Sequence, residues 1–245
     1  MPIRDILVHV DTSSSCRTRL WLAGQLARRF EADVLGIGSA AAGAAEERFM
    51  ASLSHFELRG EWHTAEGLIA PSVTAMAAAA DLVVIGQPDP DRLLVELNTP
   101  EDVIIACGRP VLVVPYVGDF GNAGDRVLVA WNGTREATRA VHDAVPLMST
   151  SKAVTVLSVN SQPKDDTDRD GLVQHLVRHG LPATTELIEQ SNLAVADIVK
   201  SRAAELSCDL VVMGAYGHSR LREMILGGMT RDMLNSMTLP VLMAH

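Results

Sequence analysis

Several features that would assign this chain to a particular class of protein are absent from its sequence. No stretch of about 18 apolar residues is present, so we expect no transmembrane helix. The N-terminal segment MPIRDILVHV lacks a long apolar run before a small-residue cleavage site; it is typical of a first β-strand, and we expect a cytoplasmic protein. The three cysteines, Cys16, Cys107 and Cys208, include no C-x-x-C pair, which indicates free thiols in a reducing compartment.

Positive charge is also scarce. The chain has 21 Lys and Arg against 30 Asp and Glu, a formal net charge of -9. A general nucleic-acid-binding role is therefore disfavoured, because a phosphate backbone requires clustered Lys and Arg. An anionic small ligand remains compatible with this charge, since a local pocket can be positive in a negative protein. The 245 residues, 47% of them hydrophobic, suffice for one large domain or two small ones.

What the sequence does contain is the same pattern twice. Three pairs of segments match in the same order: RDILVHVD with DRVLVAWN, DLVVIG with DLVVMG, and RPVLV with LPVLM. Such repetition indicates two copies of one structural unit. We therefore expect two domains, residues 1–117 and 125–245, joined by a glycine-rich linker over 118–124.

Each copy alternates strand and helix signals. Continuous apolar strands separated by helices predict an α/β fold with a parallel sheet covered on both faces. Five strands per copy give two doubly wound domains, in which ligands bind beyond the carboxyl ends of the strands. In the second copy we expect Thr134 to cap a helix, a polar segment over 162–170 to precede a helix around 171–179, and a last helix over 229–237.

A segment of the second copy has the features of a phosphate cradle. Gly214 and Gly217 follow an apolar strand and let backbone N–H groups approach an anion closely. A helix expected to open near Gly228 offers unpaired N–H groups, and Thr230 adds a hydroxyl. Further positive charge comes from His218, Arg220 and Arg222. A glycine-rich turn without a ligand is the alternative, and the spacing alone leaves it open.

The spacing Gly214-x2-Gly217-x9-Gly227 resembles the nucleotide-binding signature of the universal stress protein family, G-x2-G-x9-G-[ST]. The resemblance covers both copies and implies a tandem member of that family. It implies an adenine nucleotide alpha hydrolase-like fold and a stress-response role in which a bound nucleotide alters partner association. The implied ligand is ATP, with AMP or ADP as alternatives. Two departures concern Gly228, where the signature has Ser or Thr, and Asn132, where the family has an acidic residue.

The resemblance also implies which residues contact the nucleotide and how the copies associate. The expected contact residues are Ala130, Trp131, Asn132, Val159, Gly214, Gly217, His218, Gly227, Gly228, Met229 and Thr230. The two copies are expected to pair as an intramolecular pseudo-dimer through their apolar last strands, 110–114 and 240–244. A homodimer of whole chains is left open, and no protein partner is identified.

The first copy has different residues at the equivalent position, after its DLVVIG segment. Pro88, Asp89, Pro90 and Asp91 follow its strand. A helix expected to start at residue 98 or 99 carries acids at 101 and 102, whereas we expect no acid in the first residues of the second copy's helix. Prolines remove N–H donors and carboxylates repel phosphate, so we expect no nucleotide in the first copy.

Other interpretations have weaker support. Gly36-x-Gly38-x-x-Ala41 fits a dinucleotide fingerprint but follows the second strand, and His175 and His179 lack a third metal ligand. No P-loop lysine motif or nucleophile elbow is present. No acid or base is placed for catalysis, so we expect slow ATP hydrolysis at most. The alternatives are an interaction scaffold with both sites degenerate, or a small transferase.

Overall fold

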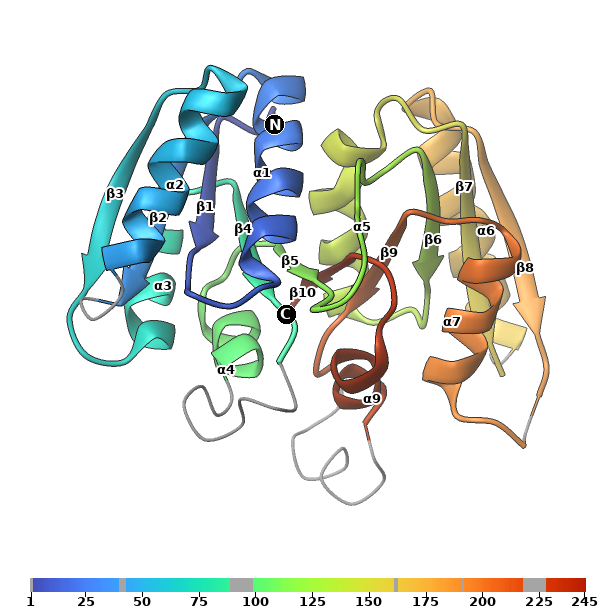
Figure 1. Cartoon of the computed structure of the whole chain (residues 1–245). Coiled ribbons are helices and arrows are strands. Elements are labelled where there is room, and N and C mark those ends of the chain that lie inside the picture. The colour runs from blue at the N-terminus through green and yellow to red at the C-terminus, as the bar shows by residue number, and fades with distance from the viewer. Residues whose placement is uncertain (1, 40–42, 89–98, 161–162, 191, 218–227) are drawn as a thin grey trace. The chain divides into compact units, whose positions relative to one another are not determined.

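A computed structural model describes residues 2–39, 43–88, 99–160, 163–190, 192–217 and 228–245. The chain divides into two compact units, Met1–Asn122 and Ala123–His245, hereafter unit 1 and unit 2 (Figure 1). This division lies within the segment 118–124 that we expected to be the linker. Each unit is an α/β domain built on a parallel sheet, which confirms the expected fold class.

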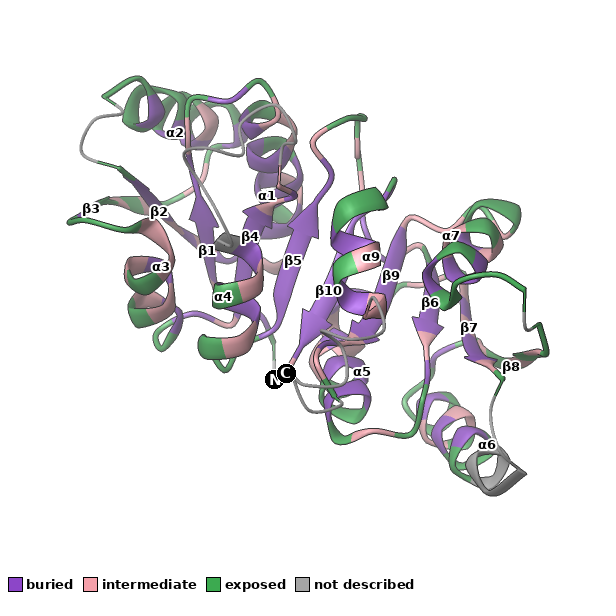
Figure 2. Cartoon of the chain, turned by 90° about the horizontal axis from the view of Figure 1, so that it is seen from below, coloured by how far each residue is buried: buried purple, intermediate pink, exposed green. Residues whose placement is uncertain are grey.

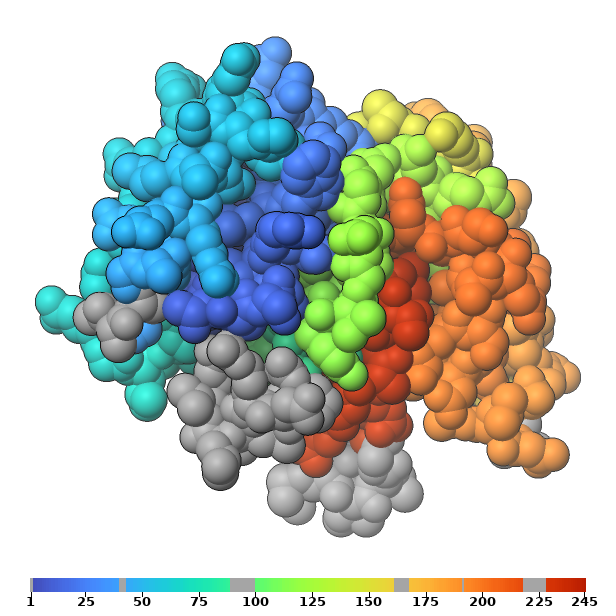
Figure 3. Space-filling model, viewed as in Figure 1, coloured from blue at the N-terminus to red at the C-terminus, as the bar shows by residue number. Residues whose placement is uncertain are grey.

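Unit 1 has five strands in the order β3-β2-β1-β4-β5. Its elements are β1 (Asp5–His9), α1 (Cys16–Phe30), β2 (Asp33–Ser39), α2 (Gly43–Phe56), β3 (Gly60–Ala65), α3 (Ile69–Ala77), β4 (Leu82–Gly86), α4 (Thr99–Ala106) and β5 (Val111–Val114). Helices α1 and α2 pack side by side on one face of the sheet (Figures 1 and 3). Helices α3 and α4 contact one another on the other face.

Unit 2 repeats this plan with the order β10-β9-β6-β7-β8. Its elements are β6 (Arg126–Ala130), α5 (Arg135–Met148), β7 (Ala153–Val159), α6 (Pro163–Arg178), β8 (Ala183–Ile188), α7 (Val195–Glu205), β9 (Leu210–Gly214), α9 (Met229–Ser236) and β10 (Val241–Ala244). Helix α5 packs on β9 and β10, and α6 packs on β7 and β8. The strand order reverses between β6 and β9 in this unit, as it does between β1 and β4 in unit 1.

The central strands form the core of each unit. Leu82–Ile85 of β4 and Leu210–Met213 of β9 are buried along their whole length, and so are β5 and β10 (Figure 2). A strand covered by helices on both faces has no solvent-facing side, which is why these segments are continuously apolar. The three cysteines are free, as expected: Cys16 and Cys107 are buried and Cys208 is half-buried.

The repeated aspartate before these strands has a structural role. In unit 1, the Asp81 carboxylate accepts hydrogen bonds from the backbone N–H groups of Arg4 and Asp5. In unit 2, Asp209 accepts from the N–H groups of residues 124, 125 and 126. Each aspartate therefore joins the start of the unit's first strand to the start of a neighbouring strand, at the edge of the sheet opposite to the expected ligand edge.

Of two helix starts predicted from the sequence, one is confirmed and the other is wrong. Thr134 is the N-cap of α5, as predicted, and its hydroxyl accepts from the N–H of Ala137. The expectation that 162–170 is an irregular polar segment before a helix at 171 is wrong. Helix α6 begins at Pro163, because proline is well suited to the first helical position and polar residues do not prevent a helix from forming. No helix among the described residues has the length and apolar character to cross a bilayer.

Candidate functional site

Two loops of unit 2 meet at the carboxyl edge of its sheet. Strands β6 and β9 are direct neighbours, and Ala130 at the end of β6 pairs in register with Met213 of β9. Parallel strands end at the same edge, so the residues after Ala130 and after Met213 emerge together there. The switch in strand order also lies between β6 and β9, which makes this edge the expected ligand position of a doubly wound sheet.

The loop after β6 is a tight turn that leads directly into α5. The side-chain oxygen of Asn132 accepts hydrogen bonds from the N–H of Thr134 at 3.3 Å and from its hydroxyl at 2.8 Å. Gly133, between them, has φ +71°. The Thr134 oxygen in turn accepts from the N–H of Ala137 at 3.3 Å. Asn132 is an exposed residue, and its side-chain oxygen is thus committed to the turn.

The two glycines of the loop after β9 lie against the start of α5. A Cβ on Gly214 would clash with the backbone of Ala137 and would lie 2.7 Å from the carbonyl carbon of Glu136. A Cβ on Gly217 would lie 2.8 Å from Oε2 of Glu136 and 3.2 Å from the Thr134 oxygen. Gly214 is therefore required by helix packing whether or not a ligand binds. The three atoms nearest to a Cβ on Gly217 belong to side chains, which can move.

Glu136 lies beside this loop and was not predicted from the sequence. Its residue exposure is 7%, and Oε1 of its carboxylate is bound by the exposed Arg135 guanidinium at 3.1 Å. Its other oxygen is directed to Gly217. A glutamate in the first turn of a helix is an ordinary sequence feature. Nothing in the local sequence indicates that this one approaches a glycine loop from a distant part of the chain.

The loop after β9 is also joined to the start of α9. The backbone N–H of Tyr216 donates to the Thr230 hydroxyl at 3.3 Å, and Thr230 is buried. Gly228 is the N-cap of α9 and supplies no side-chain cap, and Met229 is the first helical residue. Our expectation that the first residues of this helix carry no acid is wrong, because Asp232 lies in its first turn.

On the other side of β6, the predicted residues Trp131 and Val159 lie on adjacent strand ends. The N–H of Trp131 donates to the carbonyl of Leu157 at 2.8 Å, and Val159 ends β7 two residues later. The Trp131 indole is buried, and its Nε1–H has no hydrogen-bond acceptor among the described residues. The hydroxyl of Ser158 is likewise buried without a partner in the described part of the chain.

The structure therefore brings most of the predicted contact residues of unit 2 to one edge. Hydrogen bonds and close contacts connect Asn132 through Thr134 to Gly217, and Tyr216 to Thr230. His218 and Gly227 lie outside the described residues, as do Arg220 and Arg222, so their placement stays a prediction.

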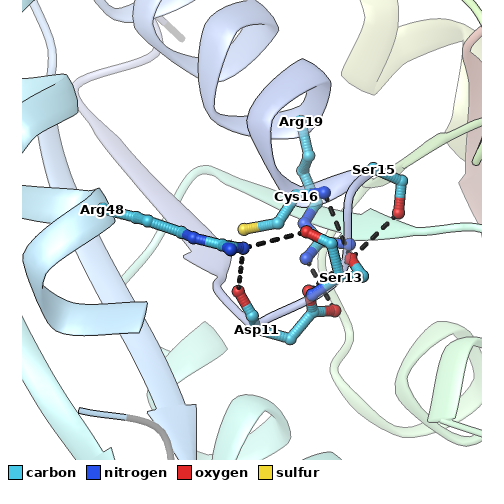
Figure 4. A network of polar contacts seen from close by, with 6 residues as sticks. All are labelled: Asp11, Ser13, Ser15, Cys16, Arg19 and Arg48. Atoms are coloured by element: carbon cyan, nitrogen blue, oxygen red, sulfur yellow. Dashed lines mark hydrogen bonds and ion pairs between the residues drawn. The ribbon is translucent and has the colours of Figure 1, made fainter. Parts of the chain in front are cut away.

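In unit 1 an internal ion pair lies at the equivalent edge (Figure 4). Arg19 of α1 has a residue exposure of 2%, and its Nη2 is 2.9 Å from Oδ2 of Asp11, just after β1. A Cβ on Gly86, at the end of β4, would clash with the Arg19 guanidinium. In the repeat, Arg19 corresponds to Ala140, Asp11 to Asn132 and Gly86 to Gly214. Gly86 of unit 1 thus lies against a guanidinium, whereas the equivalent Gly214 of unit 2 lies against the backbone of α5.

The loop after β1 is organised around Asp11 (Figure 4). Ser13 donates its backbone N–H at 2.8 Å and its hydroxyl at 2.5 Å to the Asp11 carboxylate, and accepts from the N–H of Cys16 at 3.1 Å. The Ser13 hydroxyl thus accepts from the N–H three residues on, as the Thr134 hydroxyl does in unit 2, although the N-cap of α1 is Ser15, which makes no side-chain cap. Arg48 of α2 donates to the Ser13 carbonyl at 2.9 Å and to the Asp11 carbonyl at 3.4 Å.

The buried charge of Arg19 in unit 1 shifts the pKa values of neighbouring side chains. Burial, and then the positive charge of Arg19, lowers the pKa of His9 from 6.5 to about 3. Burial would by itself raise the pKa of Asp11, but the Arg19 charge and the Ser13 hydrogen bond hold it well below its usual value. Burial also opposes the charge of Arg19, but the neighbouring Cys16 and Asp11 raise its pKa. His9 is thus a neutral base beside a permanently charged pair.

The histidine pair singled out from the sequence has a third imidazole beside it. The rings of His175 and His179 lie 4.5 Å apart, and His142 of α5 lies 5.1 Å from His175. Nδ1 of His142 is 2.8 Å from the Thr138 carbonyl. Within the described ranges, however, no three His, Cys, Asp or Glu side chains are arranged to hold a metal ion.

The family model described as "Universal stress protein family" matches residues 124–245, half of the chain. No curated protein matched the sequence. A universal stress protein from Archaeoglobus fulgidus DSM 4304 is 13% identical, with a TM-score of 0.74 over 98% of this chain and 95% of that chain.

Two further structures are similar. A functionally unknown protein from Pseudomonas aeruginosa PAO1 is 15% identical, with a TM-score of 0.64 over 99% of this chain and 92% of that chain. A universal stress protein in complex with cAMP is 19% identical and covers 48% of this chain and 100% of that chain, with a TM-score of 0.41. The family model and the fold together establish that the chain belongs to the universal stress protein family, as a tandem member with two repeated domains.

Proposed function

We propose that unit 2 binds an adenine nucleotide at the carboxyl edge of its sheet, and that occupancy alters the association of this stress protein with partners. The observation that carries the proposal is the bond between the Tyr216 N–H and the Thr230 hydroxyl. It joins the glycine loop after β9 to the first turn of α9. A glycine loop and a helix N-terminus held at one place form the usual arrangement for binding phosphate.

The start of α9 supports a phosphate at this position. Gly228 supplies no side-chain acceptor to the first N–H groups of the helix, whereas Thr134 does so for α5 in the same unit. The first N–H groups of a helix have no intrahelical partner, and a bound anion can accept from them. Gly228 therefore removes the hydroxyl of the family signature but keeps the backbone donors.

The base and ribose would lie along β6 and β7. The Trp131 Nε1–H and the Ser158 hydroxyl are buried polar groups without partners in the described residues. Burying an unpaired donor costs about 1–3 kcal/mol, so a ligand that accepts from it gains in affinity. Asn132 has its oxygen committed to Thr134, which leaves its amide nitrogen to donate to a ring nitrogen or a ribose oxygen.

Binding of adenine nucleotides to the full chain tests the proposal. Calorimetry with ATP, ADP and AMP on the native protein should show at least one of them binding. Gly217→Val should abolish that binding, because a β-branched side chain blocks the approach of a phosphate to the loop. The variant should still fold, since its new Cβ meets the movable ends of the Glu136 and Thr134 side chains.

Gly171→Val is the matched control. Gly171 is exposed on α6 of the same unit, and a Cβ there meets nothing within 4 Å. The control should bind as the native chain does, and thermal unfolding should show both variants folded. Equal loss of binding in the two variants would contradict a role for the glycine loop.

A second candidate function is an interaction scaffold without nucleotide. The observation in its favour is the Glu136 carboxylate beside Gly217, because a negative side chain at this loop opposes phosphate. If the native chain binds none of the three nucleotides, the scaffold is the better description.

A further inference from the structure

Glu136 is the charged side chain that approaches the glycine loop of unit 2 most directly among the described residues. Its Oε2 lies 2.8 Å from the place where a Cβ would stand on Gly217. The residue is 7% exposed, so the carboxylate is held inside the site and is not a solvated surface group. A ligand phosphate at Gly217 would therefore meet a fixed negative charge.

The arrangement around the carboxylate keeps this charge directed to the loop. Arg135 binds only Oε1, through Nη2 at 3.1 Å and Nε at 3.2 Å. Its guanidinium side chain is 74% exposed, so water and salt screen its compensating charge. Asp232 in the first turn of α9 adds a second negative charge at the helix whose N–H groups would bind the phosphate.

The repeat shows that this carboxylate is specific to unit 2. The hydroxyls of Ser13 and Thr134 accept at the same spacing, from the N–H groups of Cys16 and Ala137 respectively, although α1 begins at Cys16 and α5 at Arg135. This places Glu136 opposite the neutral Ser15 of unit 1. The turn does not require a carboxylate here, since unit 1 forms the same hydroxyl-to-N–H hydrogen bond without one.

We infer that Glu136 determines which nucleotide unit 2 accepts, by disfavouring ligands with a polyphosphate chain and selecting those of low negative charge. The inference rests on the proposed function, since it concerns the same site. A nucleoside monophosphate, or a nucleoside, places one phosphate charge or none beside the carboxylate. Free ATP places several there, and like charges at short range repel.

The test is a ligand series on the full chain and its Glu136→Gln variant, which keeps the shape and removes the charge. Adenosine, AMP, ADP and ATP are titrated by calorimetry in EDTA, and ATP again with Mg²⁺. The native chain should bind AMP more tightly than ATP in EDTA. Glu136→Gln should raise the affinity for ATP by about tenfold or more, that for AMP by less, and that for adenosine by less than about twofold. Glu205→Gln removes the same charge at an exposed position of α7 and should change none of these affinities.

Three other outcomes of these titrations would each overturn the inference. Equal changes for adenosine and ATP, or no change, would show that Glu136 only packs against the loop, and the inference would fail while nucleotide binding stood. Tight ATP binding by the native chain only with Mg²⁺, lost in Glu136→Gln, would make Glu136 a metal ligand and overturn the selection by charge. Absence of binding by both proteins to all four ligands would overturn both the inference and the proposed function.

Discussion

At the scale of single residues, each unit has a charged side chain beside a glycine at the carboxyl edge of its sheet. In unit 1 it is Arg19 beside Gly86, and in unit 2 it is Glu136 beside Gly217. Arg19 is paired with Asp11, and removing one partner of a buried pair leaves an uncompensated charge in the interior. The Arg19–Asp11 pair therefore stabilises the carboxyl edge of the sheet of unit 1 only when both residues are present.

His9 makes the stability of unit 1 depend on pH. Its pKa is about 3 in the folded chain and 6.5 in the unfolded chain, so between these values only the unfolded chain takes up the proton. The stabilisation from neutral, buried His9 is complete above pH 6.5 and is lost as the pH falls toward 3. The slope for one proton is at most about 1.4 kcal/mol per pH unit.

Urea unfolding at pH 7 and pH 5 checks this prediction. The native chain should lose more unfolding free energy between these pH values than the His9→Gln variant does. His63→Gln changes an exposed imidazole and is the control that should match the native chain. A His9→Gln variant with the native pH dependence would show that His9 does not titrate in this way.

At the scale of secondary-structure elements, the start of α5 organises the site of unit 2. Within one turn it supplies the Asn132–Thr134 turn, the Thr134 cap and the Glu136 carboxylate. It lies so close to the end of β9 that Gly214 has no room for a side chain. The close packing of α5 against the end of β9 therefore requires a residue without a Cβ at position 214.

Gly214→Ala should consequently destabilise unit 2 even without a ligand. Its methyl group would meet the backbone of Ala137, which cannot rotate away, and overpacking of this kind costs about 1–3 kcal/mol. Gly171→Ala, in the interior of α6 with open space around it, should be neutral or stabilising by up to about 1 kcal/mol. Denaturant titration of the two variants measures the difference. A Gly214→Ala variant as stable as the native chain would mean that α5 moves away from β9 without cost.

At the scale of the whole molecule, the two copies of one fold carry different side chains at the equivalent edge of the sheet. Unit 1 has an internal guanidinium at its edge, and Glu101 and Asp102 occupy the first turn of α4. Unit 2 has the glycine loop joined to an uncapped helix start. The expected pairing of the two copies as a pseudo-dimer stays a prediction.

One chain should therefore bind one nucleotide. Native mass spectrometry with AMP at increasing concentration should show a single occupied state per chain before non-specific adducts appear. Gly217→Val should remove that state, because the site lies in unit 2. Two equivalent occupied states, or one state that survives Gly217→Val, would contradict the assignment of the site to unit 2.

The sequence by itself determined the features that depend on neighbours along the chain. The apolar runs predicted buried parallel strands, and the repeat predicted two similar domains. Thr134 predicted the start of α5, because its hydroxyl can accept a hydrogen bond from the N–H of Ala137, three residues along the chain. The loop of Gly214 and Gly217 was placed correctly at a strand end, because glycine position and strand period are local signals. Helix α6 was the exception, since the residues of its first turns are polar and carry no apolar period.

Only the tertiary structure decided what these glycines contact. The approach of Arg19 to Gly86, and of Glu136 to Gly217, joins residues far apart in the sequence. It depends on how closely a helix packs against a strand end and on which rotamer the packing leaves open. A charge in the first turns of a helix has the same sequence pattern whether it faces solvent or a loop. For this reason the ion pair of unit 1 and the carboxylate of unit 2 became visible only once the helices were placed on their sheets.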